Sequence, residues 1–174
     1  MDTLKAMYSR KSVRSFTEEA LTKEEIDTLL TAAGAAPVGM GKYDLMHLTV
    51  ITDKELLNEI DANGAKFFGN PDLHPLYAPA ALIIVSASSE MSAEMGNANT
   101  GAIVQNMTLA AIELGLGSVY IWGCMAGLRA NPELLAKVNL PEGHTIYGSI
   151  AVGHPTEPQT ERAVSADKIA VSYI

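Results

Sequence analysis

The sequence has little cysteine and few charged residues. Cys124 is the only cysteine among 174 residues, which excludes an internal disulfide bond and a cysteine-based metal site. Charged residues make up 18% of the chain, below the ~25% of an average soluble domain, whereas hydrophobic residues make up 48%. The chain can therefore bury a sizeable core in a single domain, residues 1–174, and the apolar excess indicates an oligomer.

Positive charge is scarce and unevenly placed. The chain has 12 lysines and arginines against 20 acidic residues, a net charge of −8, which disfavours nucleic acid and anionic membranes as partners. No lysine or arginine occurs between Phe67 and Leu128, yet four of the 12 stand in the first 14 positions. An acidic chain with one local basic cluster is typical of a protein that binds a small anion.

Signals of export, membrane insertion and common nucleotide sites are also missing. The N-terminal residues are of mixed polarity and no apolar run reaches the ~18 residues that span a bilayer, so we expect a cytoplasmic protein. Neither G-x-G-x-x-G nor the P-loop pattern occurs, which disfavours a nucleotide held by a glycine-rich turn. His47, His74 and His144 lack the spacing of a metal site, and we expect no bound metal.

Hydrophobic periodicity predicts an α+β fold with helices and about five strands, without the regular alternation of a Rossmann sheet. Capping signals at Thr22 and Asn131 mark the starts of two helices. Helices are expected at about 2–9, 22–34, 53–60, 99–114 and 131–138, and strands at 46–52, 80–87, 118–122, 145–152 and 168–174.

Two segments indicate a dimer. The 99–114 helix is apolar nearly all round, with Glu113 as its only charge, and such a helix is buried inside a protein or between subunits. In a domain of this size we favour burial between subunits. The 168–174 tail alternates polar and apolar residues, has no hairpin partner of its own, and is suited to lie against a neighbouring subunit.

The basic segment Arg10-Lys11-Ser12-Val13-Arg14 is the strongest candidate for an anion site. Arginine binds phosphate oxygens through two parallel hydrogen bonds, and serine can donate another. In an extended chain Arg10, Ser12 and Arg14 point to the same side and converge on one anion. Taken alone, the segment fits a solvated charged turn at least as well, because short basic runs are common.

Other candidates for chemistry are weaker. Cys124 has no histidine or lysine nearby in the sequence to activate it, which favours a small buried residue. Trp122, at a strand end, either lines the pocket of an aromatic ligand or fills the core. No G-x-S-x-G supports a hydrolase. The glycine- and proline-rich 64–79 loop has the length of a lid, where His74 and Tyr77 could gate a site or donate a proton, although a structural role is favoured.

Six short blocks follow one another in a definite order. The basic segment follows the first helix, and the second helix leads into Ala35-Ala36-Pro37. The later blocks are Ala78-Pro79 before a strand, Gln105 to Ala111 running into Leu114-Gly115-Leu116-Gly117, Leu140-Pro141-Glu142-Gly143, and Ile150 to Pro155 with Arg162 beyond it. Their order resembles the FMN-dependent nitroreductase family over nearly the whole chain.

This resemblance implies a three-layer fold, with helices on both faces of a mixed sheet and a C-terminal strand exchanged between subunits. It also implies a homodimer with FMN at the subunit interface. Arg10, Ser12 and Arg14 would hold the FMN phosphate and ribityl chain. Arg162 would add a phosphate contact, and Lys11 would lie by the pyrimidine end. The residues expected beside the flavin ring are Ile121, Trp122 and Gly123, with Pro37, Val38, Gly39, Met40 and Gly41 from the other subunit.

The implied activity is electron transfer from NAD(P)H to nitroaromatics, quinones or similar acceptors by a ping-pong mechanism, with no particular side chain singled out as the catalytic acid. The 37–45 stretch lacks the polar side chains that the family often has there, and Trp122 is bulky where smaller or acidic residues are common. Both departures bear on the acceptor more than on FMN. Two alternatives are a flavoenzyme with a different reaction and a non-catalytic FMN-binding or sensor protein.

Overall fold

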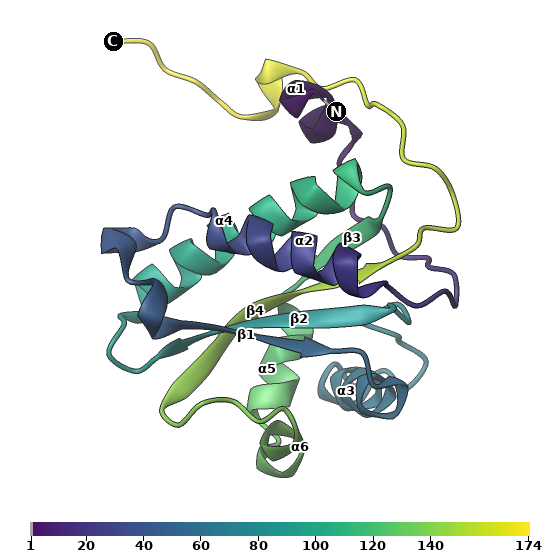
Figure 1. Ribbon diagram of the computed structural model, residues 1–174, viewed down its shortest axis with the longest axis vertical. Coiled ribbons are helices and arrows are strands. Elements are labelled where there is room, and N and C mark those ends of the chain that lie inside the picture. The colour runs from purple at the N-terminus through teal and green to yellow at the C-terminus, as the bar shows by residue number, and fades with distance from the viewer. Residues whose placement is uncertain (1) are drawn as a thin grey trace.

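The computed structural model describes residues 2–174, in which helices pack on both faces of a four-stranded sheet (Figure 1). The helices are α1 Thr3–Ser9, α2 Lys23–Gly34, α3 Lys54–Phe67, α4 Ala93–Glu113, α5 Gly123–Arg129 and α6 Pro132–Lys137. Short 3-10 turns lie at Gly39–Gly41, Tyr43–Leu45 and Ala166–Lys168. The strands are β1 Met46–Ile51, β2 Ala81–Ser88, β3 Gly117–Ile121 and β4 His144–Gly153.

The sheet has the strand order β1-β2-β4-β3, and its three pairings are antiparallel. The α+β fold is confirmed, and four of the five expected strands form close to their predicted positions. The sheet is antiparallel throughout rather than mixed, and it has four strands rather than five, because residues 169–174 form no strand within this chain. β3 is therefore an edge strand of the sheet as the single chain builds it.

The two faces of the sheet carry different helices. Figure 1 shows α2 and α4 on one face, and α3, α5 and α6 on the other. Side chains alternate along β2, so Ile83 and Val85 join the core cluster of α2 and α4, whereas Leu82 and Ile84 join that of α3 and α5. All four are fully buried. β2 is thus covered on both faces, as its continuous apolar run predicts.

Three helices differ from the sequence prediction. α3 runs on to Phe67, past the expected end near residue 60, so Gly64 lies inside the helix, packed against Cys124 of α5, and not in the expected 64–79 loop. α4 begins at Ala93 rather than near residue 99, because the hydroxyl of Ser92 caps it by accepting from the backbone N–H of Met95 at 3.3 Å. α5 was not predicted at all. Its Gly127 lies so close to α3 that a Cβ there would be 2.8 Å from the Cβ of Phe67. Packing against α3, rather than local helix propensity, therefore stabilises this short helix.

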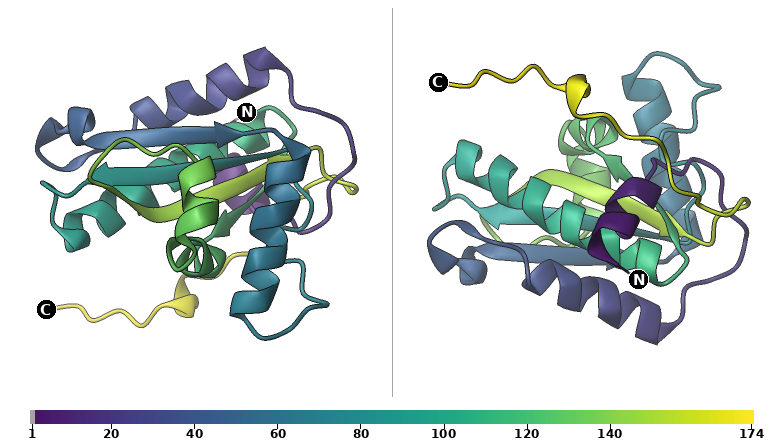
Figure 2. Two further views of the ribbon diagram at one scale, coloured as in Figure 1. Left: turned by 90° about the horizontal axis from the view of Figure 1, so that it is seen from below. Right: turned by 90° about the horizontal axis from the view of Figure 1, so that it is seen from above.

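The C-terminal tail leaves the body of the molecule after residue 168 (Figure 2). Its large apolar side chains are exposed, and that of Tyr173 is 95% accessible to solvent. A run of exposed apolar side chains of this kind is unusual in a monomer and marks a surface that another chain can cover. The exposed residues of the tail are Ile169, Val171, Tyr173 and Ile174.

Candidate functional site

The basic segment 10–14 runs along the edge strand β3. The backbone N–H of Val13 donates to the carbonyl oxygen of Ser118 at 2.9 Å. Gly117 permits this close approach, since a Cβ there would lie 2.7 Å from the Cγ1 of Val13. Val13 is buried against the strand. In an extended chain its neighbours Ser12 and Arg14 then point the other way.

The chain beyond β4 returns beside the N-terminal segment and brings Arg162 to Arg10. The backbone N–H of Thr17 donates to the carbonyl oxygen of His154 at 2.8 Å. Further along, the carbonyl oxygen of Tyr8 accepts from both the backbone N–H and the Nε of Arg162, at 3.1 and 3.3 Å. Two arginines that are far apart in the sequence therefore lie close enough to repel each other.

The electrostatics of this arginine pair favour an anion. Burial, and then the positive charge of Arg162, lower the pKa of the Arg10 guanidinium below its ordinary value. Within residues 2–174 neither arginine forms an ion pair with a carboxylate. In the same part of the chain the buried Oγ of Ser118 has no hydrogen-bond partner. Two repelling cations and an unpaired hydroxyl are the groups that a phosphate would satisfy.

Two adjoining cavities open along β3. The smaller, about 120 Å³, is lined by Arg10, Ser12 and Ser118 together with the α4 residues that face them. Val119 and Tyr120 line both cavities. The larger, about 270 Å³, is also lined by Arg14, Phe68, Leu73, Pro75, Tyr77, Ile121, Trp122, Gly123 and Cys124.

The structure divides the predicted cations between these two cavities. Arg10 and Ser12 line the smaller cavity, with Arg162 close to Arg10. Arg14 lines the larger one with Ile121, Trp122 and Gly123. Lys11 lines neither of the two. The basic segment therefore presents one arginine to each cavity, whereas the sequence prediction has Arg10 and Arg14 converge on a single anion.

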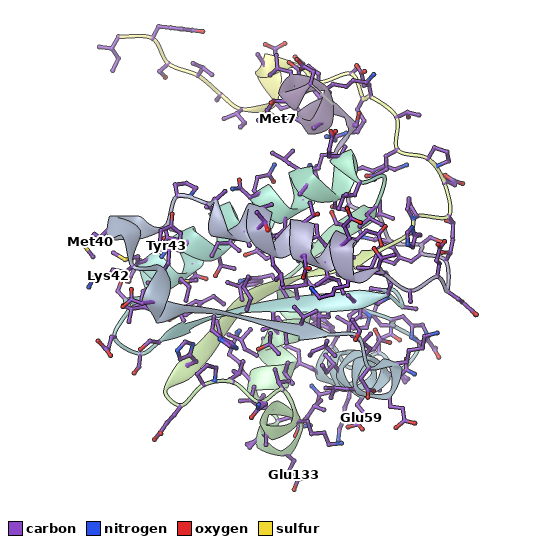
Figure 3. The ribbon with its side chains drawn as sticks, in the orientation of Figure 1. Met7, Met40, Lys42, Tyr43, Glu59 and Glu133 are labelled. Atoms are coloured by element: carbon purple, nitrogen blue, oxygen red, sulfur yellow. The ribbon has the colours of Figure 1, made fainter. Side chains whose placement is uncertain are left out.

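The predicted 37–41 segment lies elsewhere. Figure 3 shows Met40 at one end of the molecule and Met7, on α1, well away from it. The backbone N–H of Gly39 donates to the Oδ1 of Asn99 at 2.9 Å, which fastens the segment to the first half of α4. Met40 is 72% exposed. The segment lines neither cavity of its own chain and presents Met40 to the outside.

Tyr120 is a site residue that the sequence did not single out. Its side chain is 43% exposed. It lies over Gly148, where a Cβ would be 2.7 Å from the tyrosine ring. Partial burial raises the pKa of its hydroxyl. The apolar residues on either side of it, Val119 and Ile121, are buried. Because side chains alternate along a strand, Tyr120 points to the opposite, open face.

Cys124 is the small buried residue that the sequence favours. Burial, and then the negative charge of Asp61, raise the pKa of its thiol to about 12. At neutral pH the sulfur therefore stays protonated and is a poor nucleophile. Within residues 2–174 no group of three or more histidine, cysteine, aspartate or glutamate side chains could hold a metal ion. No helix in that part of the chain is long and apolar enough to cross a membrane.

The fold and these cavities define an α+β protein with an arginine-lined cavity on the edge strand of an antiparallel sheet. The chain belongs to the nitroreductase family, whose sequence model matches residues 7–154. The NADPH-flavin oxidoreductase of Vibrio harveyi is 27% identical over 168 residues, which cover 90% of this chain and 67% of that protein.

Solved structures have the same fold. An FMN-dependent nitroreductase from Clostridium difficile R20291 is 25% identical, with a TM-score of 0.81 and 99% coverage of both chains. A nitroreductase from Desulfitobacterium hafniense DCB-2, solved with bound FMN, has a TM-score of 0.85 at 23% identity, covering 99% of this chain and 100% of that one. The family and the fold that the ordered sequence blocks predict are therefore confirmed.

Proposed function

We propose that this chain is an NAD(P)H-dependent FMN oxidoreductase, built as one nitroreductase-like domain, that reduces nitroaromatics, quinones or similar acceptors. The observation that carries the proposal is that Arg162 lies close to Arg10, which lines the smaller cavity. This cavity adjoins the larger one, which Trp122 lines. The names of the relatives support it, because the Vibrio harveyi protein is an NADPH-flavin oxidoreductase and the Clostridium difficile structure is an FMN-dependent nitroreductase. The single cysteine and the use of NAD(P)H favour a cytoplasmic location.

Arg10, Ser12 and Arg162 are the groups that would hold the FMN phosphate. They combine two guanidinium groups with a hydroxyl, which is the donor set that binds a phosphate through charge-assisted hydrogen bonds. A phosphate would also relieve the repulsion between the two arginines, which share no carboxylate partner within residues 2–174. The chain's own residues therefore fit the anionic end of FMN.

The larger cavity would receive the flavin ring beside Ile121, Trp122 and Gly123. A bound flavin takes up two electrons from NAD(P)H and gives them to the acceptor in a second half-reaction. Arg14, which lines this cavity, would stabilise negative charge on the reduced ring. We assign this role to Arg14 in place of Lys11, because Lys11 lines neither cavity.

A homodimer would complete the site. Neither cavity of one chain, at about 120 and 270 Å³, reaches the roughly 300–1,000 Å³ of a pocket that buries most of its ligand. The 37–41 segment lies away from its own cavities, where it is free to reach those of a second copy. The exposed apolar tail gives that copy a surface to cover.

Anaerobic mixing with NADH or NADPH tests the proposed function. The purified protein should show the absorption of a bound flavin, and this absorption should bleach on addition of one of the two nucleotides and return with a quinone. A flavin that binds but never bleaches would instead identify a non-catalytic FMN-binding or sensor protein. A panel of acceptors separates the proposed reductase from a flavoenzyme with a different reaction.

Removal of residues 169–174 is expected to weaken the dimer. The truncation deletes Ile169, Val171, Tyr173 and Ile174, and burying one large apolar side chain is worth ~1.5–3 kcal/mol. We expect the dimer dissociation constant to rise at least ~100-fold, measured by light scattering over a dilution series. Replacing Ala166 and Asp167 with serine is the control and should leave the dimer intact. A truncated chain that stays dimeric to the same dilution would contradict the assignment.

A further inference from the structure

The segment between α3 and β2 contains two consecutive residues in a strained backbone conformation. Tyr77 has a φ of 63° and Ala78 a φ of 49°. This left-handed region is uncommon for residues other than glycine, because the Cβ crowds the backbone there. Strain of this kind persists only where the surroundings hold it, and it concentrates at functional sites. We therefore expect contacts around the 73–78 segment to hold Tyr77 and Ala78 in this conformation.

Asp61 of α3 is the main anchor of that segment. One carboxylate oxygen accepts from the backbone N–H of Leu76 at 2.8 Å, and the other lies 2.8 Å from the Nδ1 of His74. Leu76 is 1% exposed and belongs to the core cluster under α3 and α5. The residues just before Tyr77 are thus held by a side-chain anchor and by core packing together.

The ring of Tyr77 lies at the larger cavity, beside Arg14. The guanidinium carbon of Arg14 lies 5.7 Å from the centroid of this ring, within the range of a cation–π interaction. Tyr77 and Arg14 both line the larger cavity, along with Trp122. The Arg14 guanidinium also donates a 3.4 Å hydrogen bond to the carbonyl oxygen of Ser12.

We propose that Tyr77 holds the Arg14 guanidinium at the flavin cavity, and that Asp61 is a positioning residue that keeps Tyr77 in place. The inference rests on the proposed function, in which the larger cavity receives the flavin ring. His74 then acts as part of the anchor rather than as a gate. Its side chain is 76% exposed and contacts Asp61, and it is not among the residues that line the larger cavity.

Five single variants, one of them a control, and one double variant test this arrangement. Tyr77→Leu removes the ring, and Tyr77→Phe keeps it. Asp61→Ala removes the anchor, while Asp61→Asn keeps an oxygen that can accept from Leu76. Glu59→Ala is the matched control, because Glu59 lies on the same helix but pairs with Lys137.

Dissociation constants for FMN come from quenching of flavin fluorescence as each apoprotein is added, and the absorption maximum of the bound flavin is recorded as well. Tyr77→Leu should weaken FMN binding ~2- to 5-fold, as the loss of one cation–π contact implies, whereas Tyr77→Phe should match the parent. Asp61→Ala should weaken binding by no more than Tyr77→Leu does, ~2- to 5-fold, because it acts by releasing Tyr77. Asp61→Asn should recover part of this loss, and Glu59→Ala should behave like the parent.

The double variant Asp61→Ala/Tyr77→Leu decides whether Asp61 acts through Tyr77. If it does, the double variant binds FMN no more weakly than Tyr77→Leu alone. Additive losses, or a Tyr77→Leu variant with the affinity and spectrum of the parent, would overturn the inference. A parent protein that binds no FMN would refute the proposed function instead. If Asp61→Ala does not fold, Tyr77→Leu against Tyr77→Phe still decides the role of the ring.

Discussion

Arg10→Ala is expected to weaken FMN binding by ~10- to 100-fold, because a hydrogen bond to a charged group contributes ~1.5–3 kcal/mol. The substitution removes the Arg10 guanidinium, one of the two that would bind the phosphate. Arg10, which lines the smaller cavity, and Arg162 repel each other, and neither forms an ion pair with a carboxylate within residues 2–174. The measurement is the dissociation constant for FMN, from fluorescence quenching with the apoprotein.

The same substitution should not lower the stability of the apoprotein, although it weakens FMN binding. Without FMN, the loss of Arg10 relieves its repulsion with Arg162, so the free energy of unfolding should stay level or rise slightly. A structural role for Arg10 would instead lower both the stability and the affinity. Thermal unfolding with and without FMN separates the two explanations, because a ligand that binds only the folded state raises the melting temperature.

Lys137→Ala is the control for the loss of one positive charge. Lys137 lies on α6, on the face of the sheet away from α4, and pairs with Glu59. Lys137→Ala should leave the affinity for FMN unchanged.

Arg162→Ala should weaken FMN binding, as Arg10→Ala does. The double variant should lose less binding free energy than the sum of the two single losses, since both arginines would bind one phosphate. If Arg10→Ala and Arg162→Ala both bind FMN like the parent, the phosphate lies elsewhere.

The sequence was sufficient for the elements whose pattern is local. β2 is a continuous apolar run, and it forms within one residue of its predicted bounds. α2 begins at the predicted capping box, in which Thr22 and Glu25 satisfy each other's backbone groups. The basic segment likewise lies where an extended chain places it, with Val13 inward. In each case the sequence pattern that predicts the feature spans only a few neighbouring positions.

Features that depend on distant contacts were missed or only partly foreseen. α5 contains Gly123 and Gly127, which lower helix propensity, and it forms because those glycines fit closely against α3 and the residue after it. The separation of Arg14 from Arg10 follows from the position of β3, which the local pattern does not specify. The anchor between Asp61 and Leu76 joins a helix to a loop and leaves no periodic signal.

The closeness of the basic segment to β3 depends on Gly117, and Gly117→Ala should therefore damage the fold and the site together. The added Cβ would lie 2.7 Å from the Cγ1 and 3.0 Å from the Cβ of Val13, and 3.1 Å from the Cβ of Pro155. Pro155 pairs with Phe16 in a β-bridge and Val13 with Ser118 in a backbone hydrogen bond, so neither neighbour moves freely. Overpacking of this kind costs ~1–3 kcal/mol in the free energy of unfolding.

The site should suffer because Val13 stands between the residues that line the two cavities. If the new methyl group pushes Val13 outward, Ser12 and Arg14 move with it, and FMN binding should weaken beyond what the loss of stability explains. Gly34→Ala is the control, since a Cβ at Gly34 would meet nothing within 4 Å. Adding Val13→Ala to Gly117→Ala should recover part of the stability, because it removes the nearest methyl group although the Cβ of residue 13 remains. A Gly117→Ala chain as stable as Gly34→Ala, with the parent's affinity for FMN, would show that the basic segment does not depend on this contact with β3.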